Sequence, residues 1–188
     1  MSTRKPEILQ KSAMLFRKRG YQATSLKDIA KAVGMEAPSL YNHISSKNEI
    51  LNSLLQDIAM QFVSGIKDIQ QSSLKGIEKL EKAIGQYVNL SYSRPNAISL
   101  ITGEWVHLND KDKLNYLELR DQYEHIFRSI FRQAVAEGAL KPVNEDVAIF
   151  SIISTLRWIY SWINKNKSCN VVELENQLKV ILIDGLRK

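Results

Sequence analysis

Residues 24–47 read TSLKDIAKAVGMEAPSLYNHISSK, and this stretch decides the fold expected for the N-terminal part of the chain. Ser25 is a good cap for a short helix over about residues 26–33, and Asp28 stands three residues further on, as in a capping box. Gly34 follows that helix, and a residue without a side chain commonly ends a helix. The stretch therefore predicts a short, well-delimited helix and a tight turn.

A second short helix is predicted over about residues 38–43, because Pro38 suits a first helical turn, where no amide hydrogen is needed. Upstream, residues 6–19 carry apolar side chains on one face and are followed by Gly20, so they predict a supporting helix. Two short helices joined by a tight turn and backed by a first helix form the geometry that places a recognition helix in the DNA major groove.

The rest of the chain has a helical pattern as well. It holds only 8 glycines and 4 prolines, and apolar residues recur every three or four positions without strand-like alternation. Helices are predicted over about residues 6–19, 26–33, 38–43, 47–66, 74–93, 96–108, 111–137, 145–163 and 171–186. We therefore expect an all-α protein of about nine helices, with a three-helix helix-turn-helix domain over residues 1–48 and a larger helical domain over residues 49–188.

Positive charge is concentrated in the same N-terminal part. Residues 1–50 hold 9 Lys and Arg against 4 Asp and Glu, a balance of +5 out of the net +6 of the whole chain. Such a local excess favours a polyanionic partner. A solubilising basic tail is the alternative, but a tail would not carry the apolar residues interleaved with these charges, such as Leu9, Phe16 and Ile29.

The order of residues in this part closely resembles the N-terminal signature of the TetR family over about residues 7–51. The residues that carry the resemblance are Ile8-Leu9, Leu15-Phe16, Gly20-Tyr21, Thr24-Ser25, Asp28-Ile29-Ala30, Val33-Gly34, Leu40-Tyr41, His43, Ser46-Lys47 and Leu51. The resemblance implies a cytoplasmic, homodimeric, ligand-responsive regulator, by the family's habit a repressor, that binds double-stranded operator DNA. It also implies that residues 49–188 form a ligand-binding and dimerisation domain.

For the contacts to DNA phosphates, the resemblance implies four residues. Thr24 and Ser25 would offer hydroxyl and backbone donors to one phosphate. Tyr41 would donate its hydroxyl to a phosphate, and Lys47 would reach another. Such contacts position a protein on DNA and cannot choose a sequence.

Base selection should fall to the outer positions of the second short helix and the turn before it. These positions are Glu36, Ala37, Ser39 and Asn42. Asn42 suits adenine and Ala37 suits a thymine methyl group, whereas Ser39 is permissive. The family usually has Ser or Thr at position 36, so Glu36 either caps the second short helix or accepts a hydrogen bond from cytosine.

The last two predicted helices are apolar on more sides than a monomer surface requires. One stripe of the helix over residues 145–163 holds Ile149, Ile152, Leu156, Ile159 and Ile163, and its other sides hold Phe150, Ile153, Trp158, Tyr160 and Trp162. In the TetR family the last two helices pair with those of a second copy, so the resemblance implies a homodimer and an inverted-repeat operator. Charge introduced at Ile152 and Leu178 is expected to dissociate that dimer.

Aromatic residues are frequent in the C-terminal part, and such residues line pockets as well as fill cores. The resemblance implies an unknown small-molecule inducer and no cofactor. The candidate ligand-binding residues are Trp105, Tyr123, Phe127 and Trp158.

Other classes of protein are disfavoured. No run of about 18 uncharged apolar residues occurs, and the charged start lacks the apolar core of a secretory signal. Cys169 is the single cysteine, and Glu104, His107 and His125 have no spacing that predicts a metal site. No motif points to an enzyme. The alternatives are a small-molecule-binding or catalytic helical protein with an incidental basic N-terminus, and a transcription factor without an inducer.

Overall fold

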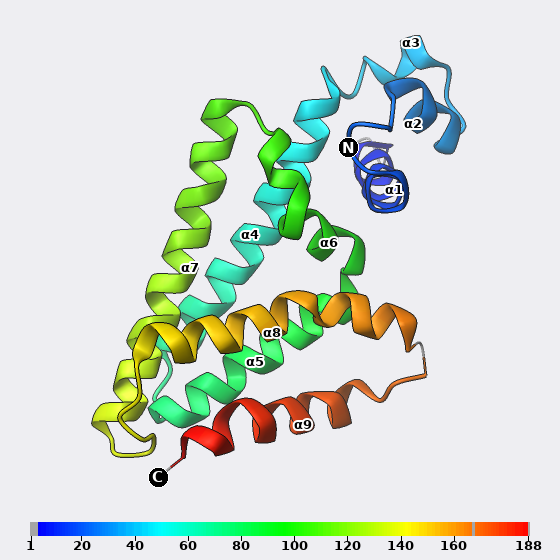
Figure 1. The fold of residues 1–188 in the computed structure, drawn as a ribbon. Helices are drawn as coiled ribbons and strands as arrows, with labels where there is room; N and C mark the ends of the chain where they lie inside the picture. Colours follow the sequence, from blue (N-terminus) through cyan, green and yellow to red (C-terminus); the bar gives the residue numbers. More distant parts are fainter. Residues whose placement is uncertain (1–3, 167, 188) are drawn as a thin grey trace. The chain divides into compact units, whose positions relative to one another are not determined.

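The chain is all-α in the computed structural model, which describes residues 4–166 and 168–187. The α-helices are α1 (Arg4–Arg19), α2 (Leu26–Ala32), α3 (Ala37–Leu40), α4 (Lys47–Gln71), α5 (Gly76–Ser93), α6 (Pro95–Gly103), α7 (Asp110–Ala136), α8 (Glu145–Lys165) and α9 (Val171–Ile183). Two short 3-10 helices are η1 (Glu104–His107) and η2 (Asp184–Leu186). The described residues form no β-strand, so the predicted fold class is confirmed (Figure 1). In the same residues, no helix combines the length and apolar character that a membrane span requires.

Packing divides the chain into two compact units. The first comprises Met1–Ala59 and Asn96–Glu118, and the second comprises Met60–Pro95 and Leu119–Lys188. Two long helices, α4 and α7, run from one unit into the other. This division differs from a boundary after residue 48, because α6, η1 and the start of α7 pack with the N-terminal helices.

The first unit is built around α1, α2 and α3, which lie together in Figure 1. The side chains of Ile8, Phe16, Ile29 and Leu40 are fully buried. Phe16 also meets the ring of Tyr21 edge-on, with 5.2 Å between the ring centroids. Each helix is amphipathic and buries its apolar face against the others, which is the predicted three-helix arrangement.

In the second unit, α5 packs against both α8 and α9. Its buried apolar residues recur at helical spacing and include Leu80, Ala83, Ile84, Tyr87 and Val88. The predicted apolar stripe of α8 is buried as a whole, at Ile149, Ile152, Leu156, Ile159 and Ile163. α9 contributes Leu178 and Ile183 to this core. These three helices therefore form a core inside one copy of the chain.

Three predicted helices are shorter in the structure. α3 stops at Leu40, and residues 41–43 form a turn in which the amide of His43 donates to the carbonyl of Leu40 over 3.0 Å. A bond to the third residue back is tighter than that of an α-helix and ends it. The predicted helix over residues 96–108 is divided into α6 and η1, and the one over residues 171–186 is divided into α9 and η2.

Gly76 allows the start of α5 to lie against α7. A Cβ atom at this position would lie 2.3 Å from the backbone nitrogen of Ala134 and 2.6 Å from its Cα atom. The amide of Gly76 donates to the carboxylate of Glu137 over 2.8 Å, which satisfies one of the free donors at the start of α5. A side chain at position 76 would therefore force the two helices apart.

We expect Gly76→Ala to lower the free energy of unfolding by about 1–3 kcal/mol, because overpacking against backbone atoms cannot be relieved by a rotamer change. Gly185→Ala is the matched control, since a Cβ atom at Gly185 meets nothing within 4 Å. Chemical denaturation of the two variants measures the difference. Equal stabilities would contradict the close approach of α5 and α7.

Candidate functional site

The loop between α1 and α2 is held by hydrogen bonds within the loop and to the end of α1. Gly20 has a φ of +85°, which suits glycine, and its amide donates to the carbonyl of Phe16 over 2.8 Å. The hydroxyl of Thr24 is buried and donates to the carbonyl of Gly20 over 2.9 Å. In the chain without DNA the Thr24 hydroxyl is therefore engaged inside the loop, and its contact with a DNA phosphate stays a prediction.

Lys47 begins α4 and turns back onto the same loop. Its ammonium donates to the carbonyl oxygens of Tyr21 and Thr24 over 2.8 Å each, and to that of Gln22 over 3.3 Å. Partial burial lowers the pKa of Lys47, and the carboxylate of Glu104 opposes that shift. An ammonium has three N–H donors, and three carbonyls occupy them. In the chain without DNA the Lys47 ammonium is therefore engaged by the loop, and its contact with a phosphate stays a prediction.

Ser25 caps α2 in the predicted capping box. Its hydroxyl accepts from the amide of Asp28 over 3.1 Å, and the Asp28 carboxylate accepts from the amide of Ser25 over 2.9 Å. Hydrogen bonds from Ser25 hold the pKa of Asp28 below its usual value. The capping role of Ser25 is therefore confirmed, whereas its contact with a phosphate stays a prediction.

The outer side of α3 and the turn after it are accessible. Glu36, Ser39, Tyr41 and Asn42 are exposed, and Ala37 is half-buried. Leu40 points the other way and is fully buried. A recognition helix reads bases with the side that faces away from its own core. Three of the four predicted base-contacting residues are thus accessible, and their contact with bases stays a prediction.

Glu36 occupies the N-cap position of α3 with an extended backbone, at φ −71° and ψ 143°. Its side chain makes no capping hydrogen bond. Of the two roles considered for Glu36, side-chain capping is therefore not observed, and base reading stays a prediction.

Two exposed cations on α2 were not singled out from the sequence. Lys27 and Lys31 are four residues apart, so they lie on one side of α2, and both are exposed. Their spacing was the signal that could have placed them. They add positive charge to α2, which packs against α3.

The helices α8 and α9 expose apolar side chains on the sides that do not face α5. Exposed fractions of 46–72% are found at Val147, Phe150, Trp158, Trp162, Val172, Val180 and Ile181. Ile152 and Leu178 are only 2% and 6% exposed, in the core of the same copy. The choice of Ile152 and Leu178 as interface positions was therefore wrong, because their stripe packs against α5.

Two of the four candidate ligand-binding aromatics do not lie in the second unit's core. Trp158 is exposed on α8 and stacks on Tyr160, with 6.4 Å between ring centroids. Trp105 belongs to the first unit, where it stacks on Tyr116 at 6.1 Å. The four residues therefore do not form one cluster.

Tyr123 and Phe127 do lie in the core of the second unit. The ring of Tyr123 meets Phe62 edge-on at 5.5 Å and lies 6.3 Å from that of Phe127. Burial, with a smaller contribution from Tyr87, raises the pKa of Tyr123. The Tyr123 hydroxyl has no hydrogen-bond partner among the described residues. A buried hydroxyl without a partner costs about 1–3 kcal/mol, so this atom is a candidate for contact with a ligand.

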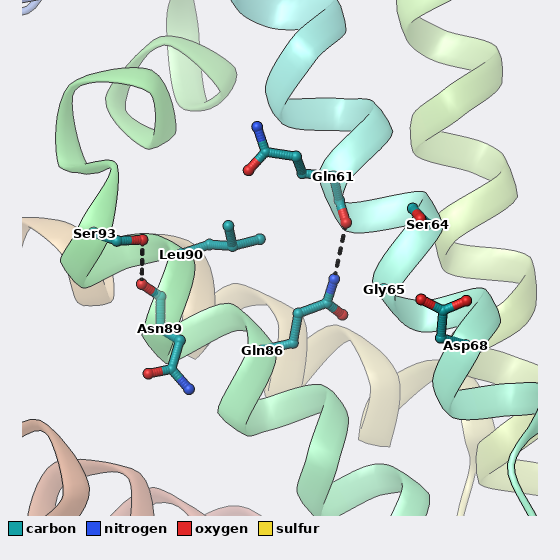
Figure 2. A pocket seen from close by; sticks show the side chains of 8 residues that line it. All are labelled: Gln61, Ser64, Gly65, Asp68, Gln86, Asn89, Leu90 and Ser93. Carbon is teal, nitrogen blue, oxygen red and sulfur yellow. Dashed lines mark hydrogen bonds between the residues drawn. The ribbon is translucent and has the colours of Figure 1, made fainter.

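An open pocket of about 420 Å³ lies between α4 and α5 in the second unit (Figure 2). Its lining consists of Gln61, Ser64, Gly65, Asp68, Gln86, Asn89, Leu90 and Ser93. The amide nitrogen of Gln86 donates to the carbonyl of Gln61 over 3.1 Å and so bridges the two helices.

A second cavity of about 310 Å³ lies between α7 and α8. Its wall combines apolar residues of α8 with charged residues of both helices, and it includes Ile149, Phe150, Ile153, Arg128 and Arg157. Arg128 forms ion pairs with Glu124, Glu145 and Asp146. Hydrogen bonds to those carboxylates raise the pKa of Arg128. The guanidinium is thus already paired with acidic groups of the protein.

Among the residues that the structure describes, no group of three or more His, Cys, Asp or Glu side chains is placed to hold a metal ion. Glu104 and His107 lie 3.5 Å apart, but they face the loop between α1 and α2. Their arrangement is that of a packing contact.

These observations define the class of the protein. An accessible short helix behind a tight turn, held by two other helices in a basic segment, is the structure of a DNA-binding helix-turn-helix protein. Residues 8–54 match the family described as bacterial regulatory proteins, tetR family, and residues 73–186 match the tetracyclin repressor-like C-terminal domain. The chain belongs to the TetR family and is a ligand-responsive, DNA-binding transcriptional regulator. The members of this family are regulators and not enzymes.

The similarity to known proteins extends over nearly the whole chain. The HTH-type transcriptional repressor KstR2 of Rhodococcus jostii is 26% identical over 187 residues, which cover 98% of this chain and 92% of the relative. The structure of the ketosteroid transcriptional regulator KstR2 of Mycobacterium tuberculosis has a TM-score of 0.94 at 22% identity, over 100% of this chain and 97% of that one. AibR, solved with isovaleryl coenzyme A and operator DNA, has a TM-score of 0.84 at 24% identity, over 96% and 98%. Both structures share the fold.

Proposed function

We propose that the chain is a homodimeric repressor that binds an inverted-repeat operator through the outer side of α3 and releases it when a small molecule binds the second unit. The proposal is based on the accessible outer side of α3. It is also based on the apolar side chains that α8 and α9 leave exposed. A two-fold dimer presents two recognition helices, which fit a two-fold site in DNA. The repressor named KstR2, similar over nearly its whole length, supports repression.

In the proposed complex, contacts to DNA phosphates provide affinity and contacts to base edges provide sequence specificity. Tyr41 exposes 58% of its surface at the end of α3 and would donate its hydroxyl to a phosphate. Lys27 and Lys31 of α2 would add attraction to the DNA backbone. Ser39 and Asn42 would meet base edges, where the amide of Asn42 can pair with adenine.

We expect Asn42→Ala to change the sequence that the protein selects from a random pool of duplexes, because it removes a base-reading amide. Tyr41→Phe should instead weaken binding to all sequences alike, because a phosphate contact carries no sequence information. Asn115→Ala, at an exposed position of α7, is the matched control. An unchanged selected motif with Asn42→Ala would remove Asn42 from the base-reading role.

The proposed dimer uses the exposed faces of α8 and α9. Phe150 and Trp158 of α8 and Ile181 of α9 each expose more than 60% of their surface, at 72%, 62% and 68%. Apolar patches of this kind on a soluble protein mark interaction sites. The occupant is a second copy, because both helices would then bury one continuous face in an isologous contact.

We expect the double variant Phe150→Asp with Ile181→Asp to be monomeric in sedimentation velocity while the unmodified protein is a dimer. The reason is that two charges on the face would be buried without partners. Tyr92→Asp is the control, because Tyr92 is 55% exposed on α5 and outside the proposed interface. A dimeric double variant with unchanged helicity would place the interface elsewhere.

The proposed ligand is a hydrophobic carbonyl compound that reaches the core of the second unit. The unpartnered hydroxyl of Tyr123 would donate to its carbonyl oxygen, and Phe62 and Phe127 would surround its apolar part. Two similar proteins support a carbonyl group next to an apolar part: AibR is solved with isovaleryl coenzyme A, a thioester whose acyl group is apolar, and KstR2 is named for ketosteroids.

Tyr123→Phe keeps the ring and removes the hydroxyl. We expect the free energy of unfolding without ligand to rise by about 1 kcal/mol, because an unsatisfied buried group is lost. Release of operator DNA by isovaleryl coenzyme A or a ketosteroid should need about tenfold more ligand, as one hydrogen bond is lost. Fluorescence anisotropy measures the release, with the exposed Tyr92→Phe as control. If neither compound changes the operator affinity of the unmodified protein, this ligand class is wrong.

A further inference from the structure

We infer that Glu104 and His107 of η1 are positioning residues for DNA binding, which hold the loop between α1 and α2 in the orientation that presents α2 and α3. They do so without touching DNA. This inference rests on the proposed two-fold binding to an operator, but it depends neither on the identity of a ligand nor on where the dimer interface lies.

Glu104 provides a hydrogen-bond acceptor to the backbone of that loop. Its Oε1 accepts from the amide of Tyr21 over 3.3 Å, across 83 positions of sequence. η1 lies in the segment that matches the C-terminal family domain, residues 73–186, and yet packs in the first unit. A segment outside the helix-turn-helix therefore supplies a partner for the loop that precedes α2.

His107 holds the same loop through its ring. The ring stacks on Tyr21, with 5.5 Å between centroids and 16° between planes, and its Nδ1 lies 3.4 Å from the Nε2 of Gln22. The backbone carbonyl of His107 accepts from the side-chain amide of Asn48 over 2.9 Å. η1 is thus bonded to α4 on one side and to the loop on the other.

The position of the loop determines the position of α2. The loop is short, because α1 ends at Arg19 and α2 starts at Leu26. A displacement of Tyr21 therefore also displaces the start of α2. The loop's backbone is held from outside, by the Lys47 ammonium on its carbonyls and by Glu104 on an amide. If one of these contacts with the loop is lost, α2 and the α3 helix that follows it can take a wider range of orientations. Only some of those orientations fit the two half-sites of an operator. Because ordering a mobile segment on binding costs free energy, affinity should fall.

The test measures affinity for the duplex that the unmodified full-length protein selects from a random pool. Glu104→Ala and His107→Ala should each weaken binding about tenfold, the effect of one lost hydrogen bond or ring contact. Glu104→Gln should bind within about twofold of the unmodified protein, because its side-chain oxygen still accepts from Tyr21. Glu118→Ala and His125→Ala, at exposed positions of α7, are the matched controls.

Hydrogen exchange separates positioning from general loss of stability. The Tyr21 amide should exchange faster in Glu104→Ala than in Glu104→Gln, while the amides of the α4 core and the thermal midpoint remain the same in both. Affinities of Glu104→Ala and His107→Ala within about twofold of the unmodified protein would overturn the inference. So would a Glu104→Gln variant as weak as Glu104→Ala, or a loss of affinity that matches the loss of folded protein. If His107→Ala does not fold, the two Glu104 variants carry the test by themselves.

Discussion

The ammonium of Lys47 donates to three carbonyl groups of the loop between α1 and α2, and the arrangement of the helix-turn-helix depends on this contact. Carbonyls in a partly buried loop need donors, because leaving them without partners costs free energy. Lys47 supplies these donors from the start of α4, while Thr24 closes the loop from inside. The loop is thereby tied to the helix that follows α3, so α1, α2 and α3 are held around Phe16 and Leu40.

A second constraint acts on the C-terminal helices, which carry apolar side chains on more sides than α5 covers. One side of α8 and one of α9 form the core with α5, and the remaining apolar side chains stay exposed. In a single copy, Phe150 and Ile181 meet water. The same helix therefore contributes one side to the core of the single copy and, in the proposed dimer, would contribute the other side to the interface.

Much of the fold could be predicted, because its signals are local. The cap at Ser25, the turn at Gly34 and the apolar spacing of α8 each depend on residues within one or two turns. The partners of Thr24 and Lys47 could not be predicted in the same way. Resemblance to a family carries over the residue type, whereas the geometry of this loop decides which atoms each side chain meets.

The sequence by itself determined the all-α class, the helix-turn-helix and the family, since periodicity, caps and glycines are properties of neighbouring residues. Only the tertiary structure decided which apolar stripe of α8 is internal, and so moved Ile152 and Leu178 from a proposed interface into the core. It also joined η1 to the loop before α2, from 83 positions away. The physical reason is that burial and long-range hydrogen bonds are shared between segments, and no single segment of sequence specifies its partner.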